Sequence, residues 1–120
     1  MRVLYVDDEP DIREVARMSL ELDSHFVVEV AGSGAEALIA ADKFQPDVVL
    51  LDVMMPDMDG PTTLAALQKE HGDTLPPVIF VTARTQAREV ERFQALGARA
   101  VIPKPFDPMT LARQVRDLVG

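Results

Sequence analysis

Residues 3–8 read VLYVDD, a short apolar run that stops at a pair of aspartates. Three later stretches repeat this design: VVLLD at residues 48–52 ends in Asp52, VIFVT at 78–82 ends in Thr82, and AVIPK at 100–104 ends in Lys104. Uninterrupted apolar runs that alternate with helical patterns are typical of parallel strands buried on both faces. The four stretches therefore predict an α/β fold with a doubly wound parallel sheet.

Helical patterns fill the spaces between the strands, and five βα units are predicted. The first two expected helices span residues 11–22 and 33–44, the third begins at Pro61, and the fourth spans residues 86–96. The fifth begins with Asp107 as its cap and Pro108 as its first helical residue. Ser33 and Glu36 have the spacing of a capping box, and Gly97 ends a helix. A less distinct strand is predicted at residues 26–30.

Composition limits the possible functions of the chain. Its 120 residues fit one domain, and a net charge of −8 argues against binding to nucleic acid or to an anionic membrane surface. The absence of cysteine excludes disulfides and thiolate metal sites. No apolar stretch approaches the roughly 20 residues of a membrane span, and the N-terminus lacks a signal-peptide layout. A soluble protein located in the cytoplasm is expected.

The polar residues that end the strands are predicted to form one site. In open α/β sheets the ligand lies beyond the carboxyl ends of the strands, so Asp7, Asp8, Asp52, Thr82 and Lys104 should converge. Adjacent carboxylates repel each other unless a cation lies between them, and Mg²⁺ prefers oxygen ligands. An isolated Asp-Asp pair is more often a solvated turn, but a third strand-end carboxylate favours a site for a divalent cation and a phosphoryl group.

Each of the other strand-end residues suits phosphoryl chemistry. A carboxylate such as Asp52 can act as a nucleophile towards phosphorus and form an aspartyl phosphate. Thr82 supplies a hydroxyl, and Lys104 supplies a cation of the kind that commonly binds phosphate. Because an X-Pro bond is the only realistic place for a cis peptide, the Lys104-Pro105 bond is predicted to be cis.

Together these motifs closely resemble a bacterial two-component response-regulator receiver domain, similar to the chemotaxis regulators. The resemblance extends from VLYVDDEP at residues 3–10 to KPF at residues 104–106. It implies a flavodoxin-like (βα)5 fold with strand order 2-1-3-4-5, and a single receiver domain over residues 1–120. It also implies phosphorelay signal transduction through a phosphoprotein.

The resemblance implies a role for each acidic residue. Asp52 corresponds to the phospho-acceptor. Asp8 and Asp52 are implied to be direct Mg²⁺ ligands, together with the backbone carbonyl of Met54, while Asp7 holds a metal-bound water. The cofactor implied is Mg²⁺.

The remaining roles concern the switch and its partners. Lys104 is implied to pair with Asp52 at rest and with the phosphoryl group afterwards, while Thr82 moves to bond that group. The phosphoryl donor would be a sensor histidine kinase or a histidine phosphotransfer protein, and small phosphodonors could also serve. The chain would be a phospho-accepting switch rather than an enzyme, promoting its own phosphoryl transfer and autodephosphorylation. It would control an output protein or a fused output domain, as a monomer or a phosphorylation-linked dimer.

One residue departs from the commonest receiver pattern. Val101 occupies the place, three residues before Lys104, where many receivers carry a Tyr or Phe that swings inward. A valine has a stiff χ1 and no ring to move, so the usual conformational output is in question. Two other functions remain as alternatives. The first is a Mg²⁺-dependent phosphohydrolase, although such enzymes favour Asp-x-Asp where this chain has Asp7-Asp8-Glu9; the second is a degenerate receiver that signals without phosphate.

Overall fold

The computed structural model describes residues 1–120 and contains one five-stranded parallel sheet with the order β2-β1-β3-β4-β5. The strands are β1 (Arg2–Val6), β2 (Val27–Ala31), β3 (Val48–Asp52), β4 (Val78–Thr82) and β5 (Ala100–Pro103). The predicted flavodoxin-like fold and its 2-1-3-4-5 order are confirmed. The strand expected at residues 26–30 is β2, displaced by one residue.

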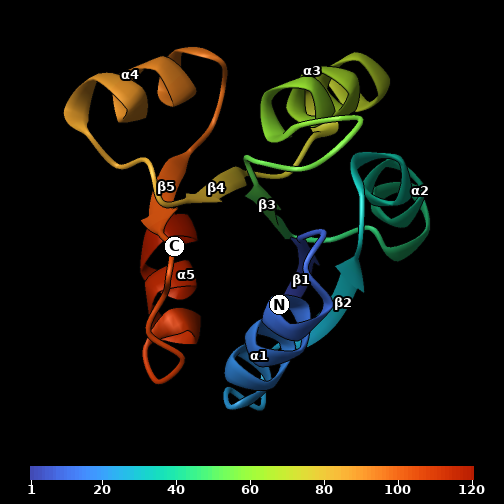
Figure 1. Cartoon of the computed structure of the whole chain (residues 1–120). Coiled ribbons are helices and arrows are strands. Elements are labelled where there is room, and N and C mark those ends of the chain that lie inside the picture. The colour runs from blue at the N-terminus through green and yellow to red at the C-terminus, as the bar shows by residue number, and fades with distance from the viewer.

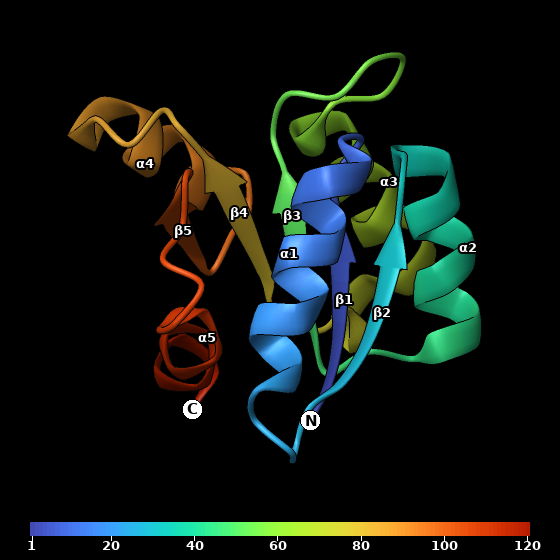
Figure 2. The ribbon, with the colours of Figure 1, turned by 60° about the horizontal axis from the view of Figure 1, so that its bottom comes forward.

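Helices cover both faces of the sheet. They are α1 (Pro10–Glu21), α2 (Gly34–Phe44), α3 (Gly60–His71), α4 (Ala87–Ala95) and α5 (Leu111–Val119), with a short 3₁₀ turn, η1 (Gly72–Thr74), after α3. Helices α1 and α5 lie on one face, and α2, α3 and α4 lie on the other (Figure 1, Figure 2). No helix combines the length and the hydrophobicity that crossing a bilayer requires.

The central strands have no solvent-facing side. Every residue of β3 and β4 is buried, and so are the last four residues of β1. Successive side chains alternate between two apolar cores, one beneath α1 and α5 and one beneath the other three helices. This double burial explains why the strands appear in the sequence as continuous apolar runs.

Local signals explain where α2 begins and where α4 ends. The Ser33 hydroxyl oxygen accepts the Glu36 N–H at 3.1 Å, as the capping box predicts. The Glu36 carboxylate reaches back one residue further than expected and accepts the Gly32 N–H at 2.9 Å. Gly97, with φ at +115°, follows α4 in a conformation that glycine adopts readily.

The predicted start of the last helix is wrong. Helix α5 begins at Leu111, and residues 107–110 form a separate turn. An Asp107 carboxylate oxygen accepts the Met109 N–H at 2.9 Å, and the Asp107 carbonyl accepts the Thr110 N–H at 3.1 Å. Asp followed by Pro favours such a turn as well as a helix start, which is why the sequence was misleading here. The Lys104-Pro105 bond is cis, as predicted.

Candidate functional site: an acidic cluster with one lysine

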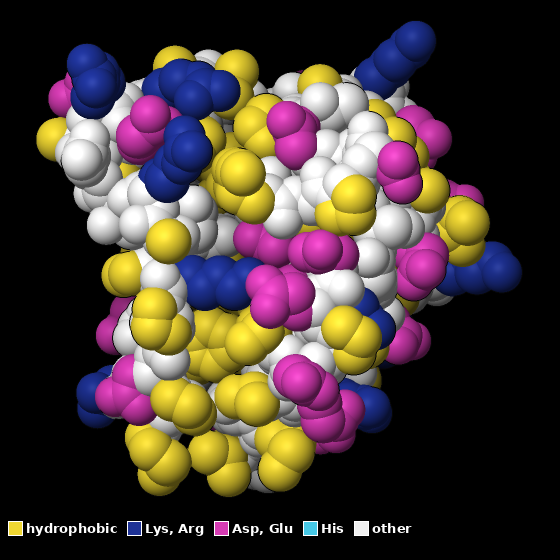
Figure 3. Space-filling view, viewed as in Figure 1, with side chains coloured by type: hydrophobic (Ala, Val, Ile, Leu, Met, Phe, Trp, Pro, Cys, Tyr) yellow, Lys and Arg dark blue, Asp and Glu magenta, His cyan; other side chains and the backbone are white.

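The structure brings the three strand-end aspartates together at the carboxyl edge of the sheet. Asp52 ends β3, while Asp7 and Asp8 follow the neighbouring strand β1. Asp7, Asp8 and Asp52 each offer one carboxylate oxygen, and these oxygens lie within 4.8 Å of one another. Acidic side chains are gathered beside a basic one near the middle of the face shown in Figure 3. We call these three aspartates and Lys104 the acidic cluster.

Asp7 is the most firmly held carboxylate in the acidic cluster. Its side chain is fully buried, and Oδ1 accepts the Glu9 N–H at 3.0 Å. Oδ2 accepts two further hydrogen bonds, from Lys104 Nζ at 2.8 Å and from the Tyr5 hydroxyl at 3.0 Å. Burial, followed by the negative charge of Asp7, raises the pKa of Tyr5, so its hydroxyl stays protonated and donates.

Lys104 lies between two carboxylates. Its Nζ is 2.8 Å from Asp7 Oδ2, 3.4 Å from Asp52 Oδ2 and 3.8 Å from the exposed Glu9 carboxylate. Burial alone would lower the pKa of Lys104, but the hydrogen bond to Asp7 and the charges of Asp52 and Asp7 outweigh it and raise the pKa. Lys104 is therefore within ion-pair distance of Asp52, the partner that the resemblance implies, but its closest carboxylate is Asp7.

Asp52 is buried in an unfavourable electrostatic environment. It is 3% exposed, and burial together with the charge of Asp7 raises its pKa to about 6, although Lys104 opposes this shift. Three carboxylates against one ammonium leave two negative charges of the acidic cluster uncompensated. A divalent cation carries the charge that would balance them, and the donors are oxygens, as Mg²⁺ prefers. The residues present therefore fit a bound Mg²⁺.

The loop after β3 is shaped around Asp52. Gly60 donates its N–H to the Val53 carbonyl at 2.8 Å, and a Cβ at position 60 would lie 2.7 Å from the Asp52 carbonyl oxygen. Only glycine allows this close approach. The Met54 carbonyl in the same loop accepts no hydrogen bond from the rest of the chain, which leaves it free to serve as a ligand.

Thr82 ends β4 beside Asp52 on the neighbouring strand. Its side chain is 2% exposed, and its hydroxyl oxygen accepts the Arg84 N–H at 3.0 Å. The hydroxyl is therefore bonded to the loop that leads to α4. A movement of this hydroxyl would therefore break or redirect that bond.

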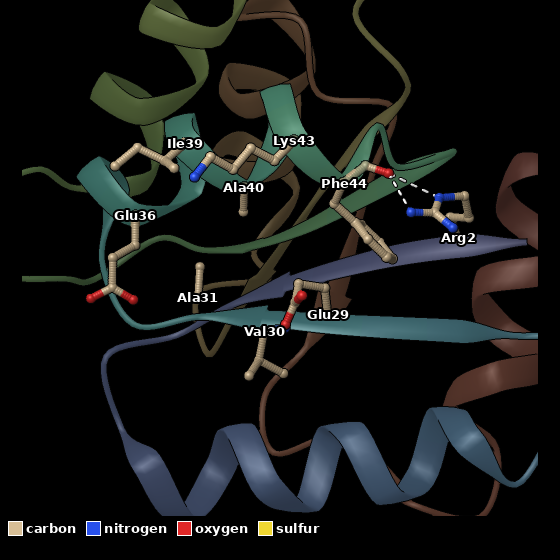
Figure 4. Close-up of a pocket in the computed structure, with 9 residues that line it drawn as sticks. All are labelled: Arg2, Glu29, Val30, Ala31, Glu36, Ile39, Ala40, Lys43 and Phe44. Atoms are coloured by element: carbon tan, nitrogen blue, oxygen red, sulfur yellow. Dashed lines mark hydrogen bonds between the residues drawn. The ribbon is translucent and has the colours of Figure 1, made fainter.

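A separate pocket of about 420 Å³ lies between β2 and α2 (Figure 4). Its lining residues include Arg2, Glu29, Glu36 and Lys43, and none of the strand-end residues. The arginine guanidinium donates to the Phe44 carbonyl, at 2.9 Å from Nε and 2.7 Å from Nη2. We call this pocket the β2–α2 groove.

Sequence reasoning missed one residue of the acidic cluster's surroundings, Tyr5. Within an apolar run a tyrosine is ordinarily a core residue, and its ring does pack in the core with Phe106. The available signal was its place two residues before Asp7, because residues two apart on a strand lie on the same face.

Comparison with known proteins agrees with the fold. The model of the response regulator receiver domain family matches residues 3–116. The response regulator MprA of Mycobacterium avium is 40% identical over 121 residues, which cover 99% of this chain and 51% of that protein. The transcriptional regulatory protein TrcR of Mycobacterium tuberculosis is 37% identical over 119 residues, which cover 99% of this chain and 45% of that protein.

Solved structures give the same result. The chemotaxis response regulator CheY4 of Vibrio cholerae superposes with a TM-score of 0.88 at 33% identity, covering 98% of this chain and 97% of that one. The receiver domain of the Francisella response regulator 1452 has a TM-score of 0.86 at 30% identity, covering 98% and 95%. The chain spans about half the length of the curated relatives that it matches. It belongs to the response regulator receiver domain family, the signalling switches of two-component systems.

Proposed function

We propose that Asp52 is the phospho-acceptor of this receiver domain and that Mg²⁺ is its cofactor. Asp8, Asp52 and the Met54 carbonyl would hold the ion directly, and Asp7 would hold it through water. The single observation that carries this proposal is the acidic cluster itself, in which three aspartates and one lysine leave two negative charges uncompensated.

Phosphoryl transfer would use Asp52 as the nucleophile. The donor would be a phosphohistidine of a sensor kinase or of a histidine phosphotransfer protein. A bond forms between an Asp52 carboxylate oxygen and phosphorus, while the bond from phosphorus to the imidazole nitrogen breaks. When bound, Mg²⁺ would supply positive charge for the phosphoryl oxygens. Asp52 must be ionised to attack, and its pKa of about 6 leaves it mostly ionised at neutral pH.

Lys104 and Thr82 would turn this event into a movement. Lys104 Nζ, already 3.4 Å from Asp52, would pair with the new phosphoryl oxygens and leave Asp7. The Thr82 hydroxyl would move to donate to the same group. This movement would break or redirect the hydrogen bond that the hydroxyl oxygen accepts from the Arg84 N–H. The loop after β4 would therefore carry the signal towards α4.

Val101 limits how the signal leaves this region. It lies in β5, is half-buried and packs against the core beneath α2, α3 and α4. Because its χ1 is stiff and it has no ring, the output would depend on the loop after β4 rather than on a rotating aromatic side chain.

The partners follow from the family. The donor would be a kinase or phosphotransfer protein, and the receiver would control a separate output protein or a fused output domain. Two matching relatives are described as transcriptional or DNA-binding regulators and are about twice as long as the chain, which supports a fused domain. Residues 1–120 would form the single receiver domain, a monomer or a phosphorylation-linked dimer, located in the cytoplasm. Autodephosphorylation would reset the switch.

The proposal is tested by phosphorylation with a small phosphodonor, followed on a phosphate-affinity gel. The wild type should shift in the presence of Mg²⁺ and not after chelation. Asp52→Asn should abolish the shift, because it removes the nucleophile. Asp57→Asn is the matched control: it makes the same change at an exposed aspartate in the following loop and should shift like the wild type. A Mg²⁺-dependent shift that persists in Asp52→Asn would refute the assignment.

A phosphohydrolase would behave differently in the same assay. It would release phosphate from small phosphomonoesters over many turnovers, and we expect none here. Glu9, where such an enzyme would favour aspartate, has an exposed side chain and lies at the edge of the acidic cluster. Sustained turnover would overturn the proposal that the chain is a switch and would favour a phosphohydrolase.

A further inference from the structure

We propose that Tyr5 is a positioning residue of the acidic cluster, whose hydroxyl fixes the Asp7 carboxylate in the orientation that Mg²⁺ binding needs. The inference rests on the proposed function, since it concerns the same metal site. Neither the family match nor the relatives assign a role to this tyrosine.

The surroundings of Tyr5 leave its hydroxyl one clear task. The side chain is fully buried in β1, and its ring meets the Phe106 ring edge to face, with centroids 6.3 Å apart. The hydroxyl donates to Asp7 Oδ2 at 3.0 Å. A phenylalanine would also fill this part of the core but would offer no donor. The packing therefore needs an apolar body, whereas the hydroxyl serves Asp7.

The hydroxyl completes a set of three donors around one carboxylate. The Glu9 N–H occupies Oδ1, while Lys104 and Tyr5 share Oδ2. Rotation of the Asp7 carboxylate would strain all three bonds together. Lys104 is proposed to leave Asp7 on phosphorylation, so it is not a permanent donor, and Glu9 lies in the loop between β1 and α1. Tyr5, in the middle of the sheet, is the fixed donor.

Groups that orient metal ligands have measurable effects on metal affinity. Loss of such a partner typically weakens binding by about 10- to 100-fold. Because Asp7 is proposed to act through water, we expect Tyr5→Phe to weaken Mg²⁺ binding by about tenfold, the lower end of that range. The Mg²⁺ concentration for half-maximal phosphorylation should rise by the same factor, and the rate at saturating Mg²⁺ should stay near the wild-type value.

The experiment is a Mg²⁺ titration by calorimetry on the wild type, Tyr5→Phe and Phe106→Leu. Phe106→Leu is the control, because it disturbs the ring contact and keeps the hydroxyl, and its Mg²⁺ affinity should be unchanged. The double variant Tyr5→Phe with Asp7→Ala should bind Mg²⁺ no more weakly than Asp7→Ala alone, because the hydroxyl acts through Asp7. Additive losses would mean that Tyr5 affects the site by another route and would overturn the inference.

A second measurement uses the unaltered protein. Tyr5 is the only tyrosine and the chain has no tryptophan, so the intrinsic fluorescence reports on this hydroxyl. Tyrosine emission should change during the Mg²⁺ titration, and the midpoint of this change should equal the midpoint measured by calorimetry. Constant emission through saturation, or a Tyr5→Phe affinity equal to the wild type, would overturn the role of Tyr5 and leave the proposed function intact. A wild type that binds no Mg²⁺ would overturn both.

Discussion

The acidic cluster and the β2–α2 groove both place charged side chains beside the sheet, but they differ in how those charges are compensated. In the cluster, Asp7 and Asp52 are buried and negative charge is in excess. In the groove, two basic and two acidic side chains balance one another, and all four residues are exposed: Arg2, Lys43, Glu29 and Glu36.

The groove is a hollow whose charged side chains are exposed, and its arginine already has partners. The Arg2 guanidinium lies 4.1 Å from the centre of the Phe44 ring and donates twice to the carbonyl of that residue (Figure 4). Such contacts are structural. Burying like charges together has a cost in folding free energy, and this cost supports the proposed role of the acidic cluster. In this chain, uncompensated buried charge points to the proposed site, whereas the volume of the groove does not.

The largest difference between the two regions should appear in metal binding. Asp8→Ala removes a proposed direct ligand and should weaken Mg²⁺ binding by at least about tenfold. Glu29→Ala removes an exposed carboxylate from the groove and should leave the affinity unchanged. Calorimetric titration measures both. Equal Mg²⁺ affinity in Asp8→Ala and the wild type would reject Asp8 as a ligand. A loss of Mg²⁺ affinity in Glu29→Ala would contradict the difference between the acidic cluster and the groove.

A smaller effect is expected on the free energy of unfolding in the absence of Mg²⁺. Burial and the charge of Asp7 raise the pKa of Asp52 from 3.8 to about 6, so ionised Asp52 destabilises the folded state. Asp52→Asn should therefore raise the free energy of unfolding at pH 7, by about 1 kcal/mol, as is common when a functional charge is removed. Urea denaturation in the absence of Mg²⁺ measures this.

The pH dependence of that difference follows from the same shift. Protonation of Asp52 stabilises the folded wild type as the pH falls through about 6, and this gain is complete below 3.8. The advantage of Asp52→Asn should shrink over that window, while the stability of Asp57→Asn should follow the wild type throughout. An advantage that stays constant with pH would show that repulsion at Asp52 is not its cause.

The smallest effect on the free energy of unfolding should come from a substitution in the groove. Arg2→Ala removes the contact with the Phe44 ring and should lower the free energy of unfolding by about 0.5–1 kcal/mol. It should change neither Mg²⁺ affinity nor phosphorylation. Thermal unfolding and the phosphorylation gel together check this. Loss of phosphorylation in a folded Arg2→Ala protein would mean that the groove contributes to function after all.

The strands could be predicted from the sequence, and so could the position of Asp52, Thr82 and Lys104 at the carboxyl ends of strands. Burial on both faces makes central strands continuous apolar runs, and parallel strands bring their carboxyl ends to one edge. The residue that follows each run is therefore located by topology alone, without knowledge of any side-chain conformation.

Side-chain geometry could not be predicted in the same way. That Lys104 lies nearer Asp7 than Asp52, and that the Tyr5 hydroxyl reaches Asp7, depends on rotamers and on differences of a few tenths of an ångström. The prediction of where α5 begins failed for another reason. The Asp107 side chain accepts a backbone N–H in a turn in the same way as it would in a helix cap, so the two structures share one sequence signal.

The most direct test of the account is to locate the phosphoryl group. The protein is incubated with a small phosphodonor and Mg²⁺, reduced with borohydride, digested and analysed by mass spectrometry. Reduction converts an aspartyl phosphate to homoserine and so marks the acceptor. We predict homoserine at position 52 only, and none when Mg²⁺ is chelated. Homoserine at another aspartate, or none at all in a protein shown to bind Mg²⁺, would contradict the account.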